Sequence, residues 1–503
     1  MKFKFIHSYL FRNSISLLLT IGLLCSGCND FLDEVPDNRV ALNNLEKAGQ
    51  LLTNAYSEGS YAFTDWMTDN VGYTRGVALR TNHIELYNWS DETTDATEQD
   101  TPTFFWNSTY NAIAHANEVL AVLDEFEVNT EEDMARKAGI ESEALLTRAY
   151  GHFMLVNLFA KHYDKQKAGT DPGVPYVLTP ETIFIETYKR NTVQEVYDQV
   201  EEDMLKGIEL VEDGFFSNSG KYHFNRNAAL AFASRFYLFK ADYSKCIEYS
   251  DRLLGNDPSS FVRDLTSDEF LNASSSIDGY SQLYSSPDLP SNLLLIRKIS
   301  LVQRPDFAHG PTSTLYRDIF ASNPFPGTTD ERENPALVKG ENAVFPVRYL
   351  SLFQRSSLNS NVGIPYHIHL AFRGEEVLFN RIESLIELNS LDEAIQDLQI
   401  LFDRRYSGQS FTLSVDLLRE AFGVADNPFV SDKFVVDFYV QLERRKEFIV
   451  QGLRWFDIKR FELEVEHNQV DGSVITLDDN DRRKVLQIPA SAIEVGKLQP
   501  NPR

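Results

Sequence analysis

The sequence is poor in cysteine. Only Cys25, Cys28 and Cys246 occur among its 503 residues. Cys25 lies in a segment that we expect to be cleaved, and Cys28 is itself a candidate for acylation, so no intrachain disulfide is expected. A chain of this length without disulfides must be held together by burial, and its 43% hydrophobic residues are enough for a large core.

The apolar run near the N-terminus is too short to cross a membrane. It covers residues 15–24, about ten positions, whereas a membrane-spanning helix needs roughly 20. Cations precede the run, and Ser26 and Gly27 follow it directly before Cys28, an order typical of a cleaved lipoprotein signal. We therefore expect a signal peptide over residues 1–27, a lipid on Cys28 and a tether over residues 28–40. The alternative is an ordinary secretory signal that leaves Cys28 as a free thiol.

Positive charge is scarce as well. Lys and Arg number 48 against 74 Asp and Glu, which gives a formal net charge of −26, and removal of the three signal-peptide cations makes it −29. Such a field repels nucleic acids and anionic lipid headgroups, so no nucleic-acid partner is expected. Membrane attachment would then depend on the acyl chains of the anchor.

Helical periodicity dominates the first half of the chain. Apolar residues recur at spacings of three and four over residues 45–56, 106–126, 131–163 and 193–211. Thr192 and Glu195 form a capping box at the start of the last of these. Two later segments, 227–254 and 372–406, predict helix pairs joined by tight turns, similar to tetratricopeptide hairpins.

The remainder of the pattern is less regular. Residues 261–346 are rich in Ser, Pro, Asn and Gly, with short apolar runs such as 293–299, and predict a loop-rich insertion. Near the end, alternation over residues 461–467, a turn at Asp471-Gly472 and the run 474–477 predict a small β-hairpin.

Five motifs follow one another along the mature chain. They are the tether CNDFLDEVPDNR at 28–39; Trp106, Tyr110, Ile113 and Asn117; Glu143, Ala144, Arg148, Ala149 and Tyr150; Arg373, Glu376, Asn380 and Glu383; and ERRKEFIVQGLRWFDIKR at 443–460, before the terminal LQIPASAIEVGKLQPNP. In this order they resemble the SusD/RagB family, the surface lipoproteins that accompany TonB-dependent transporters in Bacteroidetes.

The resemblance implies a mostly α, SusD-like helical fold with tetratricopeptide-like pairs. Its regions would be an N-terminal helical region over 41–260, the loop-rich insertion over 261–346 and a C-terminal region over 347–503 that carries the small β-hairpin. It further implies a protein without catalysis or cofactor. Such a protein captures a nutrient, an oligosaccharide or less often a peptide, for a SusC-like TonB-dependent barrel. It would be lipid-anchored in the outer membrane and face the exterior.

Aromatic residues in loops are the candidates for ligand contact, because flat rings stack on the C–H faces of sugars. The first candidate region is 61–105 and the second is the insertion. The candidates are Trp66, Tyr73, Tyr87, Trp89, Tyr280, Tyr284 and Tyr316. Trp89 and Tyr284 are the strongest of them. For each ring the competing interpretation is that it fills the core beneath its own loop.

Other conspicuous residues favour structural roles. The block 443–460 is rich in Glu, Arg and Trp at helical spacing and predicts ion pairs and packing anchors. His367 and His369 share a strand face but lack a third metal ligand, so a half-exposed structural role is expected and no metal site is predicted. The acidic run 478–481 lacks the Gly and Glu of an EF-hand loop and predicts a turn.

Two other functions stay open on the sequence. Carboxylates are plentiful, so a surface glycan hydrolase with two paired carboxylates is one alternative, although nothing isolates such a pair. A helical-repeat adaptor that docks other surface proteins is the second. The adaptor would bury its loop aromatics or turn them toward a protein.

Overall fold

A computed structural model of the chain describes residues 42–93, 97–181, 187–216, 219–302, 306–321, 323–333 and 335–503. Residues 44–503 form one compact unit. The longer helices are α3 (Leu45–Leu52), α5 (Pro102–Val122), α6 (Glu131–Phe159), α7 (Val193–Leu210), α8 (Arg226–Phe239), α9 (Tyr243–Leu254), α13 (Gly374–Glu387), α14 (Leu391–Asp403) and α16 (Asp432–Glu447). The prediction of a mostly α fold is confirmed.

Shorter elements connect these helices. They are α4 (Thr81–Tyr87), α10 (Asp268–Ala273), α11 (Ile277–Tyr284), α12 (Ser313–Ala321), α15 (Val415–Ala421), α17 (Arg454–Arg460), α18 (Ala490–Glu494), and the 3-10 turns η1 (Ala62–Met67), η2 (Leu123–Glu125), η3 (Asp213–Phe216), η4 (Gly220–Tyr222), η5 (Pro258–Phe261) and η6 (Arg482–Lys484). No helix among the described residues is both long and apolar enough to cross a membrane.

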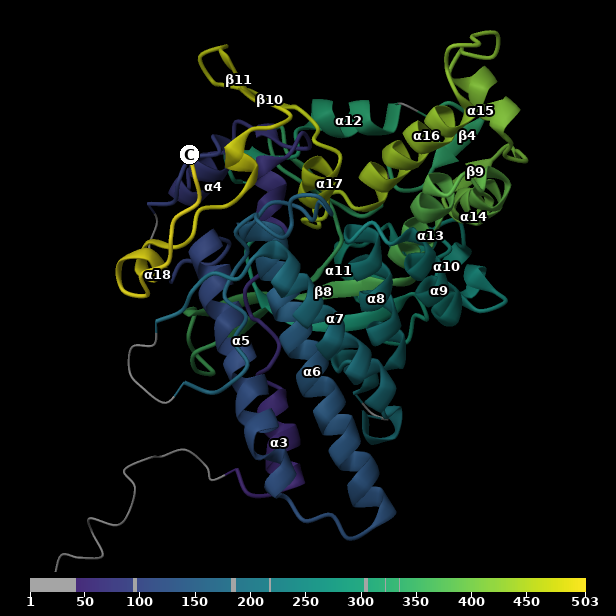
Figure 1. Cartoon of the computed structure of the whole chain (residues 1–503). Helices are drawn as coiled ribbons and strands as arrows, with labels where there is room; N and C mark the ends of the chain where they lie inside the picture. Colours follow the sequence, from purple (N-terminus) through teal and green to yellow (C-terminus); the bar gives the residue numbers. More distant parts are fainter. Residues whose placement is uncertain are drawn as a thin grey trace, which may run out of the picture. The chain divides into compact units, whose positions relative to one another are not determined.

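Helix α6 lies at the centre of the N-terminal helices. It contacts α3, α5, α7 and α8 (Figure 1). Nearly every residue of α6 from Gly139 to its end is buried. Its buried half is mainly apolar, and the polar side chains that it carries have internal partners, as Arg148 has in Asp203.

Three helices begin or end away from their expected positions. One is α6, which ends at Phe159 where the pattern predicted an end at residue 163. α5 begins at Pro102, because the side chain of Thr101 accepts a hydrogen bond from the Phe104 amide and proline suits the first turn. α3 ends at Leu52 although the apolar pattern continues to residue 56. The residues after Leu52 therefore leave the helix and become available to line a cavity.

Both predicted helix pairs are present, as α8 with α9 and α13 with α14, and α13 also packs on α9. Their turns are alike. Ala241 and Asn389 have positive φ values of 56° and 63°. In each turn the following amide bonds back to a carbonyl five residues earlier, Asp242 to Tyr237 and Ser390 to Leu385. This is the Schellman way of ending a helix.

A three-stranded antiparallel sheet in the order β2-β8-β7 lies beside the helices. It comprises β2 (Asn292–Ile299), β8 (Gly363–Arg373) and β7 (Leu350–Arg355). β2 comes from the predicted insertion, and β7 and β8 come from the C-terminal region, so a shared sheet joins the two. The region boundaries themselves stay predictions.

The remaining strands form small pairs: β1 (Gly72–Tyr73) with β3 (His309–Gly310), β4 (Thr328–Asp330) with β9 (Tyr406–Gly408), β5 (Leu337–Lys339) with β6 (Val344–Pro346), and β10 (Val465–Asn468) with β11 (Val474–Leu477). The last pair is the predicted hairpin. The Gln469 amide donates to the Ser473 carbonyl, so the loop consists of residues 470–472 and is one residue longer than the expected two-residue turn. Gly472 adopts a φ of 85° in this loop.

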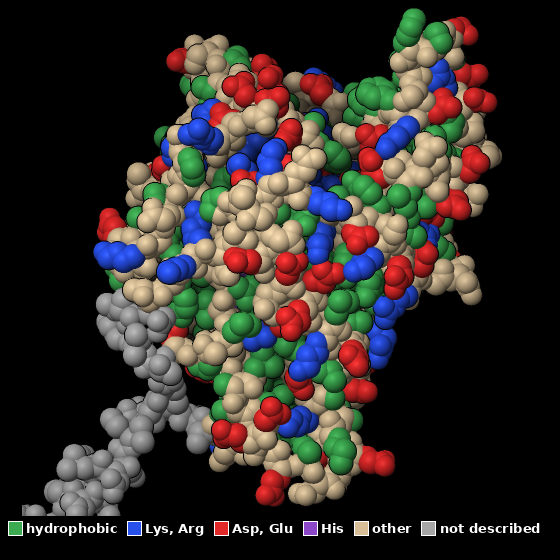
Figure 2. Space-filling view, viewed as in Figure 1, with side chains coloured by type: hydrophobic (Ala, Val, Ile, Leu, Met, Phe, Trp, Pro, Cys, Tyr) green, Lys and Arg blue, Asp and Glu red, His purple; other side chains and the backbone are tan. Residues whose placement is uncertain are grey.

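Figure 2 shows acidic side chains spread over the visible surface of the described residues, with Lys and Arg among them. Many basic groups lie inside instead. The guanidinium groups of Arg235, Arg332, Arg348, Arg373 and Arg405 are fully buried. Arg332 pairs with Asp330 and Glu443, and Arg405 pairs with Glu447.

Candidate functional site

Three of the predicted ligand-binding rings pack in the core around histidines. The ring of His467 lies between Tyr87 and Trp89, with ring centroids 4.0 and 4.4 Å away, and we call these three residues the His467 stack. The indole N–H of Trp89 donates to the Met67 carbonyl at 2.9 Å. Trp66 stacks on His83 and donates to the His309 carbonyl. All three predicted rings are buried.

The three rings predicted from the insertion are also buried. Tyr280 and Tyr284 stack on each other on one face of α11. The Tyr284 hydroxyl accepts a hydrogen bond from Arg373, and the Tyr316 hydroxyl donates to the Arg332 carbonyl. Trp89 also borders a cavity of about 420 Å³, so its contact with a ligand stays a prediction. For the other five buried rings, contact with a ligand would require a conformation other than this one.

Tyr73 is the exception, because its side chain on β1 is partly exposed. Its contact with a ligand stays a prediction. Cys28, the predicted lipidation site, lies outside the described residues, as do the signal peptide and the tether.

The block 443–460 has the structural role that was predicted, with different partners. Arg444 pairs with Asp457 rather than with Glu447, whose partner is Arg405. His367 and His369 share a face of β8, but both are buried rather than half-exposed. Among the described residues, no three His, Cys, Asp or Glu side chains are grouped to hold a metal ion.

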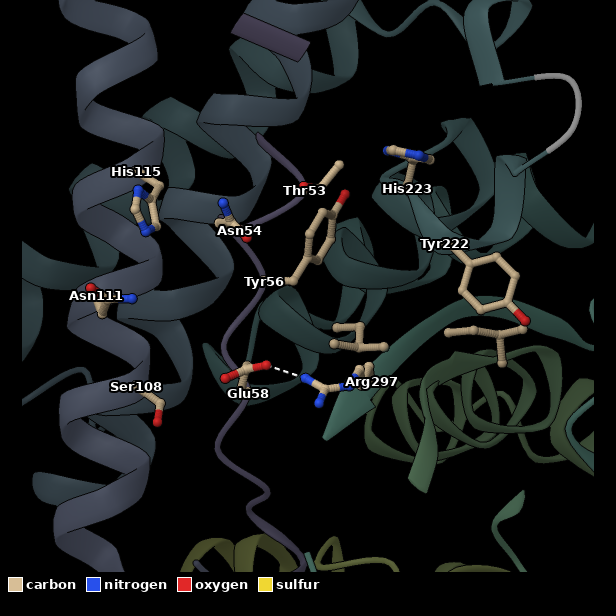
Figure 3. Close-up of a pocket in the computed structure, with 12 residues that line it drawn as sticks. Thr53, Asn54, Tyr56, Glu58, Ser108, Asn111, His115, Tyr222, His223 and Arg297 are labelled. Carbon is tan, nitrogen blue, oxygen red and sulfur yellow. Dashed lines mark hydrogen bonds and ion pairs between the residues drawn. The ribbon is translucent and has the colours of Figure 1, made fainter. Parts of the chain in front are cut away.

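A cavity of about 490 Å³, which we call cavity A, opens beside α5. Ser108, Asn111 and His115 line one wall, because spacings of three and four place them on a single stripe of the helix. Figure 3 shows these side chains on the α5 side and the ring of Tyr56 in the middle of the view. This stripe lies on the side of α5 nearly opposite the buried Ile113.

The segment that follows α3 forms the floor of cavity A. Thr53, Asn54, Tyr56 and Glu58 all line it. Two hydrogen bonds hold the Tyr56 hydroxyl in place. It donates to the buried carboxylate of Glu143 and accepts a hydrogen bond from the Phe224 amide at 2.8 Å. Burial and the carboxylate of Glu143 raise the pKa of Tyr56, so the phenol stays protonated and keeps donating.

The opposite wall comes from η4 and β2. Tyr222 is 41% exposed, and its ring lies on the side of the cavity opposite α5 (Figure 3). His223 lies beside it, with Nδ1 2.7 Å from the Glu143 carboxylate. Glu143 thus holds residues from two walls, Tyr56 and His223, in fixed positions.

Charge in cavity A is balanced by a pair at its edge. Arg297 of β2 and Glu58 form an ion pair, drawn as a dashed line in Figure 3. Arg297 also donates to the side-chain oxygen of Gln354 at 3.0 Å. The cavity therefore offers two rings, amides, hydroxyls and a neutralised ion pair, which suits an uncharged polar ligand.

Comparison with known proteins agrees with this architecture. A SusD-like family model described as starch-binding and associating with the outer membrane matches residues 30–238. A SusD-like protein of Formosa agariphila is 22% identical over 513 residues, which cover 91% of this chain and 93% of that protein. The chain is thus similar to SusD-like proteins over most of its length.

Solved structures share the same fold. A SusD superfamily protein from Bacteroides thetaiotaomicron is 19% identical with a TM-score of 0.66, and the match covers 92% of this chain and 100% of that one. A structure described as a putative sugar binding protein from Bacteroides vulgatus is 18% identical with a TM-score of 0.68, covering 92% and 99%. A laminarin-binding SusD-like protein is 16% identical with a TM-score of 0.59, covering 92% and 99%.

None of the residues that line cavity A was among the candidates from the sequence. One signal was available: the polar stripe Ser108, Asn111 and His115 on a helix whose opposite face carries apolar residues such as Trp106 and Ile113. The other walls carry no local signal, since Tyr222 lies in a short turn and Tyr56 at the end of an expected helix.

Proposed function

We propose that this protein binds an uncharged oligosaccharide in cavity A and delivers it to a SusC-like TonB-dependent barrel. The observation that carries the proposal is the half-exposed ring of Tyr222, which faces a polar cavity that also contains the ring of Tyr56. Rings of this kind stack on sugar faces, while Asn54 and Asn111 supply amide donors and acceptors for hydroxyl groups.

The relatives support a carbohydrate as the ligand. Their descriptions include starch binding, sugar binding and laminarin binding. The charge of the chain favours a neutral glycan over an acidic one, because a formal charge of −26 repels polyanions and Arg297 is already paired.

The anchor belongs to the proposed mechanism. A lipid on Cys28 would hold the protein on the outer face of the outer membrane, and a short tether would keep its binding site near the barrel at high effective concentration. A modest affinity would serve transfer, since a long residence time would slow release to the barrel.

Calorimetry of the mature protein against a glycan panel tests the binding step. We expect at least one neutral oligosaccharide to bind, the Tyr222→Ala variant to bind it more weakly, and Tyr222→Phe, which keeps the ring, to bind nearly as well. Phe434→Ala removes an exposed ring on α16 and serves as the matched control. Absence of binding across the panel would contradict the proposal, and new reducing ends would indicate a hydrolase instead.

The delivery step needs a separate test. A tagged protein purified from detergent-solubilised outer membranes should bring down a TonB-dependent barrel. Cys28→Ala should abolish lipid labelling and reduce this co-purification. Recovery of other surface proteins without a barrel would favour the adaptor.

A further inference from the structure

Four phenylalanine side chains gather on α15, α16 and the loop that joins them. They are Phe422, Phe429, Phe434 and Phe438, and we call them the phenylalanine patch. Phe429, Phe434 and Phe438 are 96%, 60% and 43% exposed. The ring centroid of Phe438 lies 5.3 Å from that of Phe422 and 6.2 Å from that of Phe434. In Figure 1, α15 lies at one end of the compact unit, far from α3.

Helix α16 is apolar on two faces. Its inner face is buried and carries Val435, Val436, Tyr439 and Val440. Phe434 and Phe438 are four residues apart and therefore share a stripe on the outer side of the helix. The water-facing side of a surface helix is usually polar, and a group of exposed apolar side chains marks an interaction surface. The phenylalanine patch therefore lacks a cover in the isolated chain.

Acidic groups surround the patch. Residues 415–438 contain five Asp or Glu and two Lys or Arg, a formal charge of −3. Both cations are already paired, Arg419 with Asp432 at 3.0 Å and Lys433 with Glu387 at 2.9 Å. Figure 2 shows Asp and Glu among hydrophobic side chains at the upper right, where α15 lies. The surroundings of the patch are thus short of positive charge.

Asp437 shows the effect of this shortage. It precedes Phe438 on α16, and burial together with the charges of Glu383 and Glu387 raises its pKa to about 6. A carboxylate in such surroundings is stabilised when a positive group approaches it. A partner that brings Lys or Arg to the edge of the patch would supply that group.

This charge favours one kind of occupant over the others. A second copy of the chain would bring the same −3 patch and the same overall charge of −26, and an anionic lipid surface would be repelled as well. A protein segment with apolar side chains flanked by Lys or Arg fits better. Its apolar groups would cover the rings, and its cations would meet the carboxylates and the ring faces.

We infer that the phenylalanine patch is the docking surface for an apolar segment, flanked by Lys or Arg, on the extracellular side of the partner barrel. No residue of the patch lines cavity A, so docking there would leave that cavity free to hold a glycan. The inference rests on the proposed delivery step. It adds the surface of this chain, and the chemistry, through which the two proteins would meet.

A double substitution in the patch tests the inference. Full-length tagged protein with Phe429→Asp and Phe434→Asp is purified from detergent-solubilised outer membranes, and the co-purified barrel is quantified. We expect recovery of the barrel to fall about tenfold or more relative to wild type, because exposed rings at the centre of an interface carry much of its affinity. These rings are the two most exposed in the patch, so the variant should fold and bind glycan like the wild type.

A matched control adds the same two charges elsewhere. Leu358 and Val362 lie between β7 and β8 and are 95% and 73% exposed. The variant with Leu358→Asp and Val362→Asp should recover as much barrel as the wild type. A fall in recovery equal to that of the patch variant would show that added charge alone weakens the complex, and would overturn the inference.

A second pair of variants tests the charge of the partner. Asp426 is exposed in the loop that carries Phe429, and Asp426→Lys should lower barrel recovery more at low than at high ionic strength. Glu127→Lys changes the net charge equally at an exposed position between α5 and α6, and it should have no effect. Equal recovery with Asp426→Lys and Glu127→Lys at low ionic strength would contradict a basic partner.

The outcomes separate the docking surface from the delivery step. If the wild type brings down the barrel and the Phe429→Asp, Phe434→Asp variant does so equally well, the docking surface is overturned and delivery stands. A wild-type dimer in light scattering that this variant dissociates would also overturn it, because the patch would then meet a second copy. If the wild type brings down no barrel, the delivery step fails together with the inference.

Discussion

Tyr87 and Trp89 lie in the buried His467 stack, whereas Tyr56 and Tyr222 line cavity A. Both groups combine aromatic rings with polar neighbours, which is the composition expected of a sugar site. In the stack, His467 lies nearly parallel to Tyr87, at an interplanar angle of 3°, and covers a face of each neighbouring ring. In cavity A, Tyr222 remains 41% exposed. A ring is available to a ligand only where its own protein leaves a face uncovered.

The largest effect is expected from the His467 stack. Trp89→Ala removes a buried indole that packs on His467 and donates to the Met67 carbonyl. We expect the free energy of unfolding to fall by about 3–5 kcal/mol, as for other buried aromatic truncations. Urea denaturation followed by fluorescence measures it. If Trp89→Ala kept full stability and lost glycan binding, the stack would be a ligand site and the comparison would be reversed.

A pH series tests the buried region next to the stack. Burial raises the pKa of Asp65, the neighbour of Trp66, from 3.8 to about 8, although the Gly452 amide bonds to its carboxylate at 2.7 Å. The pKa of Asp65 is higher in the folded than in the unfolded protein. Its contribution to the free energy of unfolding is therefore complete below pH 4 and is lost as pH rises toward 8.

Asp65→Asn removes this titration. We expect the variant to gain roughly 2–4 kcal/mol relative to wild type between pH 5 and pH 8. Thermal unfolding of both proteins across this range gives the difference, in which the titration of other groups cancels. A difference that stays constant with pH would show that Asp65 is ionised in the folded protein.

The elements that the sequence predicted well are those whose causes are local. The capping box at Thr192 begins α7, and the two helix pairs form where the apolar spacing placed them. The block 443–460 was also interpreted correctly as structural, because its charge spacing matches a packed helix. Its partners, such as Arg405 for Glu447, could not be read from the sequence.

The site was not predictable for a related reason. His467, which covers Tyr87 and Trp89, lies 380 residues after Tyr87 in the chain. The openness of cavity A depends on the early end of α3, whose apolar pattern continues past Leu52. Whether a ring face is covered is decided by tertiary contacts, and composition alone does not record them.

A third prediction concerns the support beneath cavity A. Tyr56→Phe keeps the ring but leaves the Phe224 amide without its acceptor and removes one donor from Glu143. We expect a loss of about 1–2 kcal/mol in the free energy of unfolding, typical of an unsatisfied buried group. Chemical denaturation measures this loss, and calorimetry should find glycan affinity nearly unchanged. An equally stable variant would mean that the Tyr56 hydroxyl does not hold the cavity floor.

The smallest change in stability, and the sharpest test of the comparison, belongs to Tyr222. Because its ring is half-exposed, Tyr222→Ala should alter the free energy of unfolding by less than about 0.5 kcal/mol. Its affinity for the bound glycan should nevertheless fall about three- to tenfold, equivalent to the roughly 0.5–1.5 kcal/mol of an aromatic contact.

Trp89→Ala should show the reverse pattern. Its free energy of unfolding should fall strongly, while the molecules that remain folded should bind the glycan with unchanged affinity. Measuring the free energy of unfolding and the glycan affinity of both variants shows whether each ring belongs to the core or to the ligand site. A Tyr222→Ala variant that is destabilised as much as Trp89→Ala would mean that Tyr222 belongs to the core, and cavity A would then lack an open ring.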